Sequence, residues 1–238
     1  MATLTKQGLC FWLLTLLACQ LNAAEQRKRF DIKTPLWMQN IAALEVPSLR
    51  FEDGRARHYI EYCSGTLLHD VETSQPRYIL SAWHCVEHYH DLSQALRVRF
   101  PHLGDGNAVY KARLMDSGGR IDRDWALLEL SASIPEQQLS GLPLIASDPE
   151  KPATAAGFAL ALEQGKNRLS FDDTCQTQDS ISWEHCVTSK GASGGPLVQT
   201  LDGTTGIVGV ISQGDSQTLT ISFPSTRLPQ RWRQRLTL

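Results

Sequence analysis

The stretch Lys190-Gly191-Ala192-Ser193-Gly194-Gly195-Pro196-Leu197-Val198 decides how this chain is interpreted. Two glycines directly follow Ser193 and another stands two residues before it, so the backbone can turn sharply and hold the serine hydroxyl toward solvent. The turn also leaves room for peptide N–H groups to gather around a developing oxyanion. By itself the motif is explained equally well by an ordinary loop turn, so its meaning depends on the rest of the chain.

Two motifs upstream supply a histidine and an aspartate. The first is Leu80-Ser81-Ala82-Trp83-His84-Cys85 and the second is Arg123-Asp124-Trp125-Ala126-Leu127-Leu128-Glu129-Leu130. Asp124 directly precedes an apolar run, where a buried carboxylate is expected, whereas Asp116 and Asp122 do not. The chain therefore carries a histidine, an aspartate and a serine in that order, each in a fitting local context.

Together these motifs resemble the trypsin-like (chymotrypsin-fold) serine peptidases over most of the chain. The block Cys63-Ser64-Gly65-Thr66-Leu67-Leu68 adds to the resemblance. The resemblance implies that Ser193 is the nucleophile, His84 the general base and Asp124 the group that orients the imidazole. It also implies an oxyanion hole made by the backbone N–H groups of Gly191 and Ser193.

The resemblance further implies the position of a primary specificity pocket. Its walls are Val187, Thr188 and Ser189 on one side and Ile211, Ser212, Gln213 and Gly214 on the other. Ser212 also stands where the family has a serine near the buried aspartate. Val187 replaces the acid of the tryptic pocket, and Ile211 replaces the histidine of the glutamyl branch. We therefore predict an uncharged pocket that accepts small or medium apolar P1 side chains.

The chain departs from the trypsin branch beside the nucleophile. That branch has an aspartate where this chain has Ala192, and a cysteine where it has Ser189. Because alanine cannot form an ion pair with a new N-terminus, activation by N-terminal insertion is not expected. A non-acidic residue before the serine is closer to the bacterial glutamyl-endopeptidase-like branch.

The remainder of the mature chain reads as many short apolar or alternating runs separated by glycine-containing turns. These runs are residues 46–51, 59–63, 78–81, 96–100, 110–114, 126–130, 153–162, 196–199, 206–212 and 219–223. The predicted fold is all-β, with two antiparallel six-stranded-type barrels, the active site in the cleft between them and a short C-terminal helix. The domains are predicted as 1–24 signal peptide, 25–45 N-terminal segment, 46–140 first barrel, and 141–238 second barrel with the helix. We expect the helix to pack its apolar face on the second barrel.

The N-terminal residues predict export. A thin positive region at Lys6, an apolar stretch too short to span a membrane and the small residues before Glu25 are typical of a signal peptide. Periplasmic and extracellular locations both stay open, and a lipoprotein anchored at Cys19 is a minority alternative. The basic triplet Arg27-Lys28-Arg29 is expected to be a solvated stretch, with a processing site as the alternative.

Four cysteines remain after the leader, and they allow three pairings. The resembled family bridges the cysteines at the positions of Cys63 and Cys85, next to the catalytic histidine. That leaves Cys175 to pair with Cys186.

The net charge of −2 at pH 7 gives no general attraction to nucleic acid or to anionic membranes. The expected partner is a protein or peptide substrate, the expected state is a monomer, and no cofactor or metal is expected. His84 and His88 stand four residues apart, which could suit zinc on a short helix, but such a site would compete with the triad for His84. Other histidines are expected at the surface: His58, His69, His102 and His185.

The predicted function is a secreted or periplasmic serine endopeptidase that works through an acyl-enzyme intermediate. Two alternatives stay open. An inactive homologue could bind a partner through the same cleft, because the aspartate missing at Ala192 could leave the oxyanion loop without support. An esterase could use the same three residues, although the order His, Asp, Ser and the all-β pattern disfavour the α/β-hydrolase version.

Overall fold

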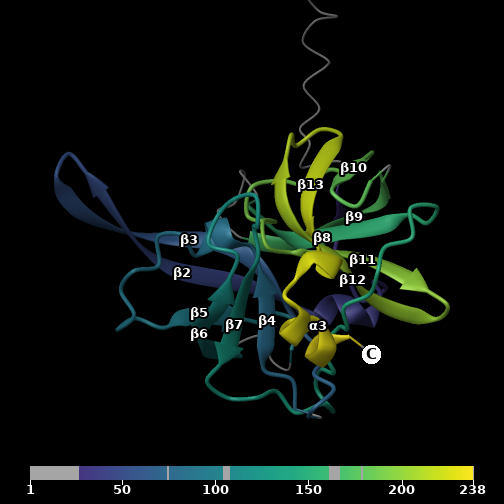
Figure 1. The fold of residues 1–238 in the computed structure, drawn as a ribbon, viewed down its shortest axis with the longest axis horizontal. Coiled ribbons are helices and arrows are strands. Elements are labelled where there is room, and N and C mark those ends of the chain that lie inside the picture. The colour runs from purple at the N-terminus through teal and green to yellow at the C-terminus, as the bar shows by residue number, and fades with distance from the viewer. Residues whose placement is uncertain (1–26, 74, 104–107, 161–166, 178, 238) are drawn as a thin grey trace, which may run out of the picture.

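The computed structural model describes residues 27–73, 75–103, 108–160, 167–177 and 179–237. The predicted signal peptide, including Cys19, lies outside these residues. The described chain is all-β and forms two antiparallel six-stranded barrels, as predicted (Figure 1).

The first barrel closes in the order β2-β3-β4-β7-β6-β5. Its strands are β2 (Ile41–Glu52), β3 (Arg55–Leu67), β4 (Tyr78–Ser81), β5 (Leu96–Arg99), β6 (Val109–Ser117) and β7 (Ala126–Leu130). β2 and β3 join at a two-residue turn, Asp53-Gly54, in which both residues have positive φ. Such a turn matches the twist of a hairpin, and the β2–β3 hairpin extends well beyond the barrel wall (Figure 1).

The second barrel contains β8 (Ala153–Leu160), β9 (Asn167–Thr177), β10 (Ser182–Glu184), β11 (Pro196–Leu201), β12 (Thr204–Gly214) and β13 (Leu219–Pro224). The strands follow the order β9-β10-β13-β12-β11-β8, and β8 pairs with β9 to close the ring. A short strand from the N-terminal segment, β1 (Lys28–Arg29), adds to β9 from outside. The basic triplet is therefore not a solvated stretch: Lys28 and Arg29 are exposed, but the Arg27 side chain is buried.

The connection between the barrels is tied to both of them. Leu142 N donates to Leu67 O in β3, and Leu144 bridges Ile207 in β12. Short 3-10 helices occur at η1 (Leu36–Asn40), η2 (Trp83–Cys85) and η3 (Ser225–Arg227).

The one α-helix of the described chain is α3 (Gln230–Leu236). Its polar contacts go to the first barrel rather than to the second. Trp232 Nε1 donates to Asp116 Oδ2 and its ring lies 5.8 Å from that of Tyr78, while Arg235 forms an ion pair with Asp70. These acidic and aromatic partners lie on the first barrel, near β4 and β6, whereas the buried Leu236 belongs to a core cluster that also contains Ile207 and Phe223 of the second barrel. The packing of the apolar face on the second barrel stays a prediction.

None of the helices in the described part of the chain has the length and apolarity needed to cross a membrane.

Candidate active site

His84 and Asp124 are brought together by two neighbouring strands of the first barrel. His84 lies in η2 just after β4, and Asp124 lies just before β7. Because β4 pairs antiparallel with β7, with Ser81 opposite Ala126, the end of one strand lies beside the start of the other. The Nδ1 atom of His84 is 2.7 Å from Asp124 Oδ2, and the backbone N–H of His84 donates to Asp124 Oδ1 over 2.8 Å.

The carboxylate of Asp124 is buried and accepts a further hydrogen bond from the second barrel. Its relative exposure is 1%, and Ser212 Oγ in β12 donates to its Oδ2 over 2.5 Å. A carboxylate can only accept, so Nδ1 of His84 carries a proton, and in the neutral imidazole Nε2 then keeps its lone pair. The arrangement fixes one tautomer of an imidazole that is itself partly exposed.

Ser193 lies in a tight turn that packs against the first barrel. Gly191 and Gly194 have φ values of +94° and +80°, which only glycine adopts readily. A Cβ at Gly194 would come within 2.3 Å of Ser64 O, so a larger residue would clash there. Ser64 N donates to Ser193 O over 2.8 Å, and Ser64 Oγ donates to Gly191 O over 2.8 Å. One first-barrel serine therefore holds the turn on both sides of the nucleophile candidate.

The backbone N–H groups of Gly191 and Ser193 have no hydrogen-bond acceptor within the part of the chain that the structure describes. The neighbouring N–H groups are used, since Ala192 N donates to Ser189 O and Gly194 N donates to Ile211 O. Two donors next to a partly exposed serine are thus left to bind an incoming oxygen.

No hydrogen bond joins Ser193 Oγ to His84 among the described residues. Both residues lie close to the sulfur of Cys85: Cys85 Sγ is 3.9 Å from His84 Nε2 and 3.8 Å from Ser193 O. Catalytic hydrogen bonds between a base and a nucleophile are often long without substrate, so this geometry is compatible with a base and a nucleophile.

A cavity of 410 Å³ opens beside Ser193. It is lined by Thr188, Ser189, Lys190, Ser193, Ile211, Gln213, Gly214 and Ser216. The residues expected in a primary pocket largely meet here. Two do not: Val187 is buried behind the wall and lines a separate cavity of 250 Å³, and Ser212 turns toward Asp124.

Sequence reasoning missed two lining residues, Lys190 and Ser216. Lys190 directly precedes Gly191, so its position next to the oxyanion turn was a usable signal. Ser216 has a φ of +60°, and a serine in the sequence does not indicate that its backbone adopts this turn conformation. No carboxylate lines this cavity in the described chain.

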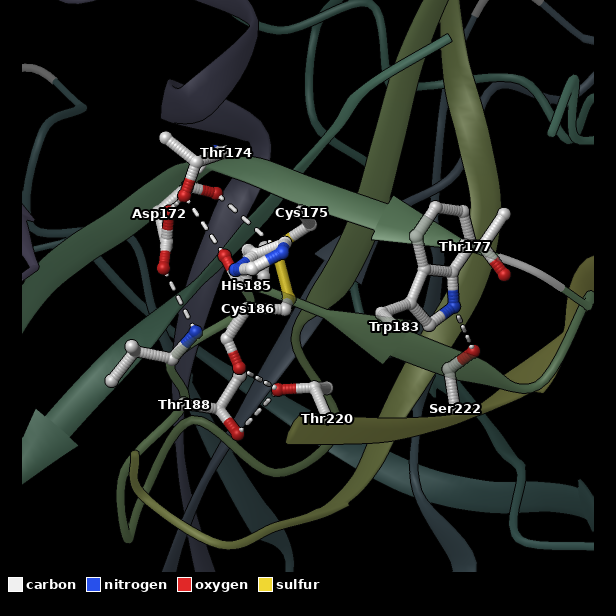
Figure 2. The surroundings of a disulfide bond; sticks show 12 residues. Asp172, Thr174, Cys175, Thr177, Trp183, His185, Cys186, Thr188, Thr220 and Ser222 are labelled. Atoms are coloured by element: carbon white, nitrogen blue, oxygen red, sulfur yellow. Dashed lines mark hydrogen bonds between the residues drawn. A yellow bond between two sulfur atoms is a disulfide. The ribbon is translucent and has the colours of Figure 1, made fainter. Parts of the chain in front are cut away.

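Two disulfides flank the site, with the expected pairing. Cys63–Cys85 joins β3 to η2 beside His84. Cys175–Cys186 joins β9 to the segment that leads into the cavity wall, next to Asp172, Thr188 and Thr220 (Figure 2).

The site does not offer metal ligands. The Cys63, His84 and Cys85 ligand atoms lie within 4.8 Å of one another, but both sulfurs are committed to the disulfide and cannot be thiolates. No cluster of three ligands in the described residues combines His84 with His88.

Two barrels joined in this way fit the chymotrypsin fold of the trypsin-like serine peptidases. A family model described as the lysyl endopeptidase C-terminal domain matches residues 42–224, which span both barrels. The chain belongs to this family. No curated protein matches it. Arg27 and α3 lie outside the matched residues.

Proposed function

We propose that this protein is a serine endopeptidase whose catalytic residues are His84, Asp124 and Ser193. The observation that carries the proposal is the buried Asp124 bonded to Nδ1 of His84, which leaves Nε2 as a base beside the glycine turn of Ser193. Membership of a peptidase family supports the reaction class.

The proposed mechanism follows from these groups. His84 Nε2 takes the proton of Ser193 Oγ as the oxygen attacks the scissile carbonyl, and it later gives that proton to the leaving amine. Asp124 stabilises the imidazolium that forms between these steps. The N–H groups of Gly191 and Ser193 donate to the oxyanion of each tetrahedral intermediate. Water then attacks the acyl-enzyme, with His84 again as base.

The substrate backbone is proposed to add to β12 as an extra strand. The β12–β13 register shifts between Ile211 and Gln213, so Ser212 lies outside that ladder. The extended peptide is proposed to pair at this irregular position, where the Ser212 side chain donates to Asp124.

The proposed P1 preference is for uncharged small or medium side chains. The family name points to lysine, which a pocket binds with a carboxylate, yet the described lining carries none and includes Lys190 instead. A lysine near the pocket disfavours a cationic P1 residue by like-charge repulsion. The closer similarity to the glutamyl-endopeptidase-like branch stays a prediction, as does export to the periplasm or beyond; the two disulfides fit an oxidising compartment.

A fluorophosphonate probe tests the proposal directly, because it reacts only with an activated serine. Purified mature protein should be labelled, and Ser193→Ala should not. Absence of labelling in the disulfide-bonded protein would contradict the proposal and favour a partner-binding homologue. Cleavage of a P1-randomised peptide library then tests the pocket, and a strong preference for Lys, Arg or Glu would contradict the uncharged assignment.

A further inference from the structure

Arg27 is a buried cation that the proposed mechanism does not use. Its relative exposure is 5%, although it precedes the first barrel and belongs to the N-terminal segment. Strand β1 places it: Lys28 pairs with Phe171 and Arg29 with Ser170, so antiparallel pairing brings Arg27 toward Asp172.

The Arg27 guanidinium is bound on all sides by oxygen atoms of the second barrel. Nε donates to Ser170 Oγ over 3.0 Å, and Nη2 donates to Ser170 O over 2.6 Å and to Ala155 O over 3.4 Å. Nη1 donates to Val187 O. Burial lowers the pKa of Arg27 to about 10 while the nearby Asp172 opposes that shift, so the side chain is charged at neutral pH.

Asp172 binds the other backbone polar group of Val187. Its Oδ2 accepts the Val187 N–H over 2.8 Å, and its Oδ1 accepts the N–H and hydroxyl of Thr174 (Figure 2). A buried anion thus binds the N–H of Val187 and a buried cation binds its C=O. Hydrogen bonds to charged groups are about twice as strong as neutral ones, so this backbone position is held firmly.

Val187 leads directly into the wall of the cavity beside Ser193. Thr220 Oγ1 donates its only proton to Cys186 O. The hydrogen bond between the two threonines must therefore be donated by Thr188 Oγ1 and accepted by Thr220 Oγ1. Next along the chain, Ser189 O accepts from Ala192 N. A continuous set of bonds therefore runs from Arg27 through the wall to the turn of the nucleophile.

We propose that Arg27 and Asp172 form a clamp that positions the primary pocket for substrate. Arg27 is a positioning residue: it touches neither the substrate nor Ser193, and it acts through Val187 and the wall that follows. The inference rests on the proposed peptidase function for its kinetic part only.

The experiment compares Arg27→Gln with Arg29→Gln, which changes an exposed arginine two residues away on the same segment. Arg27→Lys is the second variant, because it keeps the charge but loses the planar fork. We expect Arg27→Gln to raise KM for a peptide substrate between about tenfold and on the order of 100-fold, since small displacements of positioning groups have effects of that size. The rate of fluorophosphonate labelling, which does not need the pocket, should stay within about twofold. Arg27→Lys should recover part of the loss, and it also serves if Arg27→Gln does not fold.

Hydrogen exchange gives a readout that needs no activity. The amide of Val187, which donates to Asp172, should exchange at least tenfold faster in Arg27→Gln, with β4 (Tyr78–Ser81) unchanged as an internal reference. The inference is overturned if Arg27→Gln matches Arg29→Gln in KM and exchange, or if labelling falls as much as kcat/KM, which would place the effect on the nucleophile instead. If the unmodified protein neither labels nor cleaves, the peptidase proposal fails, and exchange alone still decides the role of Arg27.

Discussion

The two barrels hold their functional groups by different means. In the first barrel, His84 and Asp124 stand at the ends of strands that pair with each other. In the second, Ser193 and the cavity wall that follows Val187 lie in loops that are held from outside: by Ser64 of the first barrel and by Arg27 of the N-terminal segment. The base is thus positioned by a local sheet, whereas the nucleophile turn and pocket depend on contacts from distant parts of the chain.

This contrast predicts different kinetic consequences. Changes next to His84 should act on the chemical step, because they alter the base and its carboxylate directly. Changes around the second-barrel loops should act mainly on substrate binding, because these loops form a wall of the cavity that receives the substrate.

Removing either end of the proton relay should be the most severe change. Ser193→Ala and His84→Ala should each lower kcat by on the order of 10⁶-fold, and the double variant should be no worse, because the residues act as a unit. Steady-state hydrolysis of a peptide substrate measures this, with Ser216→Ala, a change at another residue of the cavity lining, as the control for kcat. Additive losses would contradict a shared mechanism.

The buried carboxylate should come next. Asp124→Asn should lower kcat by on the order of 10⁴-fold, because an amide can donate to Nδ1 and would stabilise the wrong tautomer of His84. Ser212→Ala removes only one hydrogen bond to the charged group, so a loss of about 10- to 100-fold is expected. Steady-state kcat of the two variants on the same peptide substrate measures this difference. Equal losses in the two variants would show that the tautomer is not what Asp124 controls.

The two disulfides should differ in how much they stabilise the fold. Replacing either pair by alanines should cost about 2–4 kcal/mol of unfolding free energy. The Cys63–Cys85 separation of 22 residues is twice the Cys175–Cys186 separation of 11, which adds about 0.6 kcal/mol to the first. Urea unfolding measures this difference.

Their kinetic effects should differ more than their stabilities. Loss of Cys63–Cys85 should lower kcat, since that bridge lies 3.9 Å from His84 Nε2, whereas loss of Cys175–Cys186 should mainly raise KM through the cavity wall. The opposite pattern would break the division between the barrels.

The sequence predicted the parts of the site that carry their own local signal. Asp124 precedes an apolar strand and Ser193 stands among glycines, and each pattern requires only its own neighbours. The barrel count followed from periodicity in the same way. The hairpin of β2 and β3 was found at its turn, but its strands run further than predicted, mainly into their buried inner ends at residues 41–45 and 64–67, and for β3 also into the exposed residues 55–58.

The sequence did not predict what depends on distant pairing. Strand β9 was missed because Ser170, Asp172 and Thr177 break its apolar pattern. These polar side chains are nevertheless buried, and hydrogen bonds satisfy them there. Arg27 was misjudged for the same reason: a basic triplet looks solvated until its partners, more than 120 residues away, are known. The docking of α3 likewise depends on Asp70 and Asp116, which no helical spacing reveals.

The smallest expected effect concerns the contact between the N-terminal segment and the first barrel. The ring of His102 lies 3.9 Å from that of Phe30, and its Nε2 is buried without a partner in the described chain, so this histidine is not the surface residue expected. Burial lowers the pKa of His102 below 6.5. The unfolded chain therefore binds a proton near pH 6.5 while the folded protein does not, and stability should fall as the pH drops from above 6.5 through the folded pKa.

His102→Gln should flatten this slope in urea unfolding between pH 7.5 and pH 5, whereas His90→Gln, at an exposed position, should not. An unchanged slope in His102→Gln would mean that the contact tolerates the charged ring, and that this link between the N-terminal segment and the first barrel is looser than the clamp at Arg27.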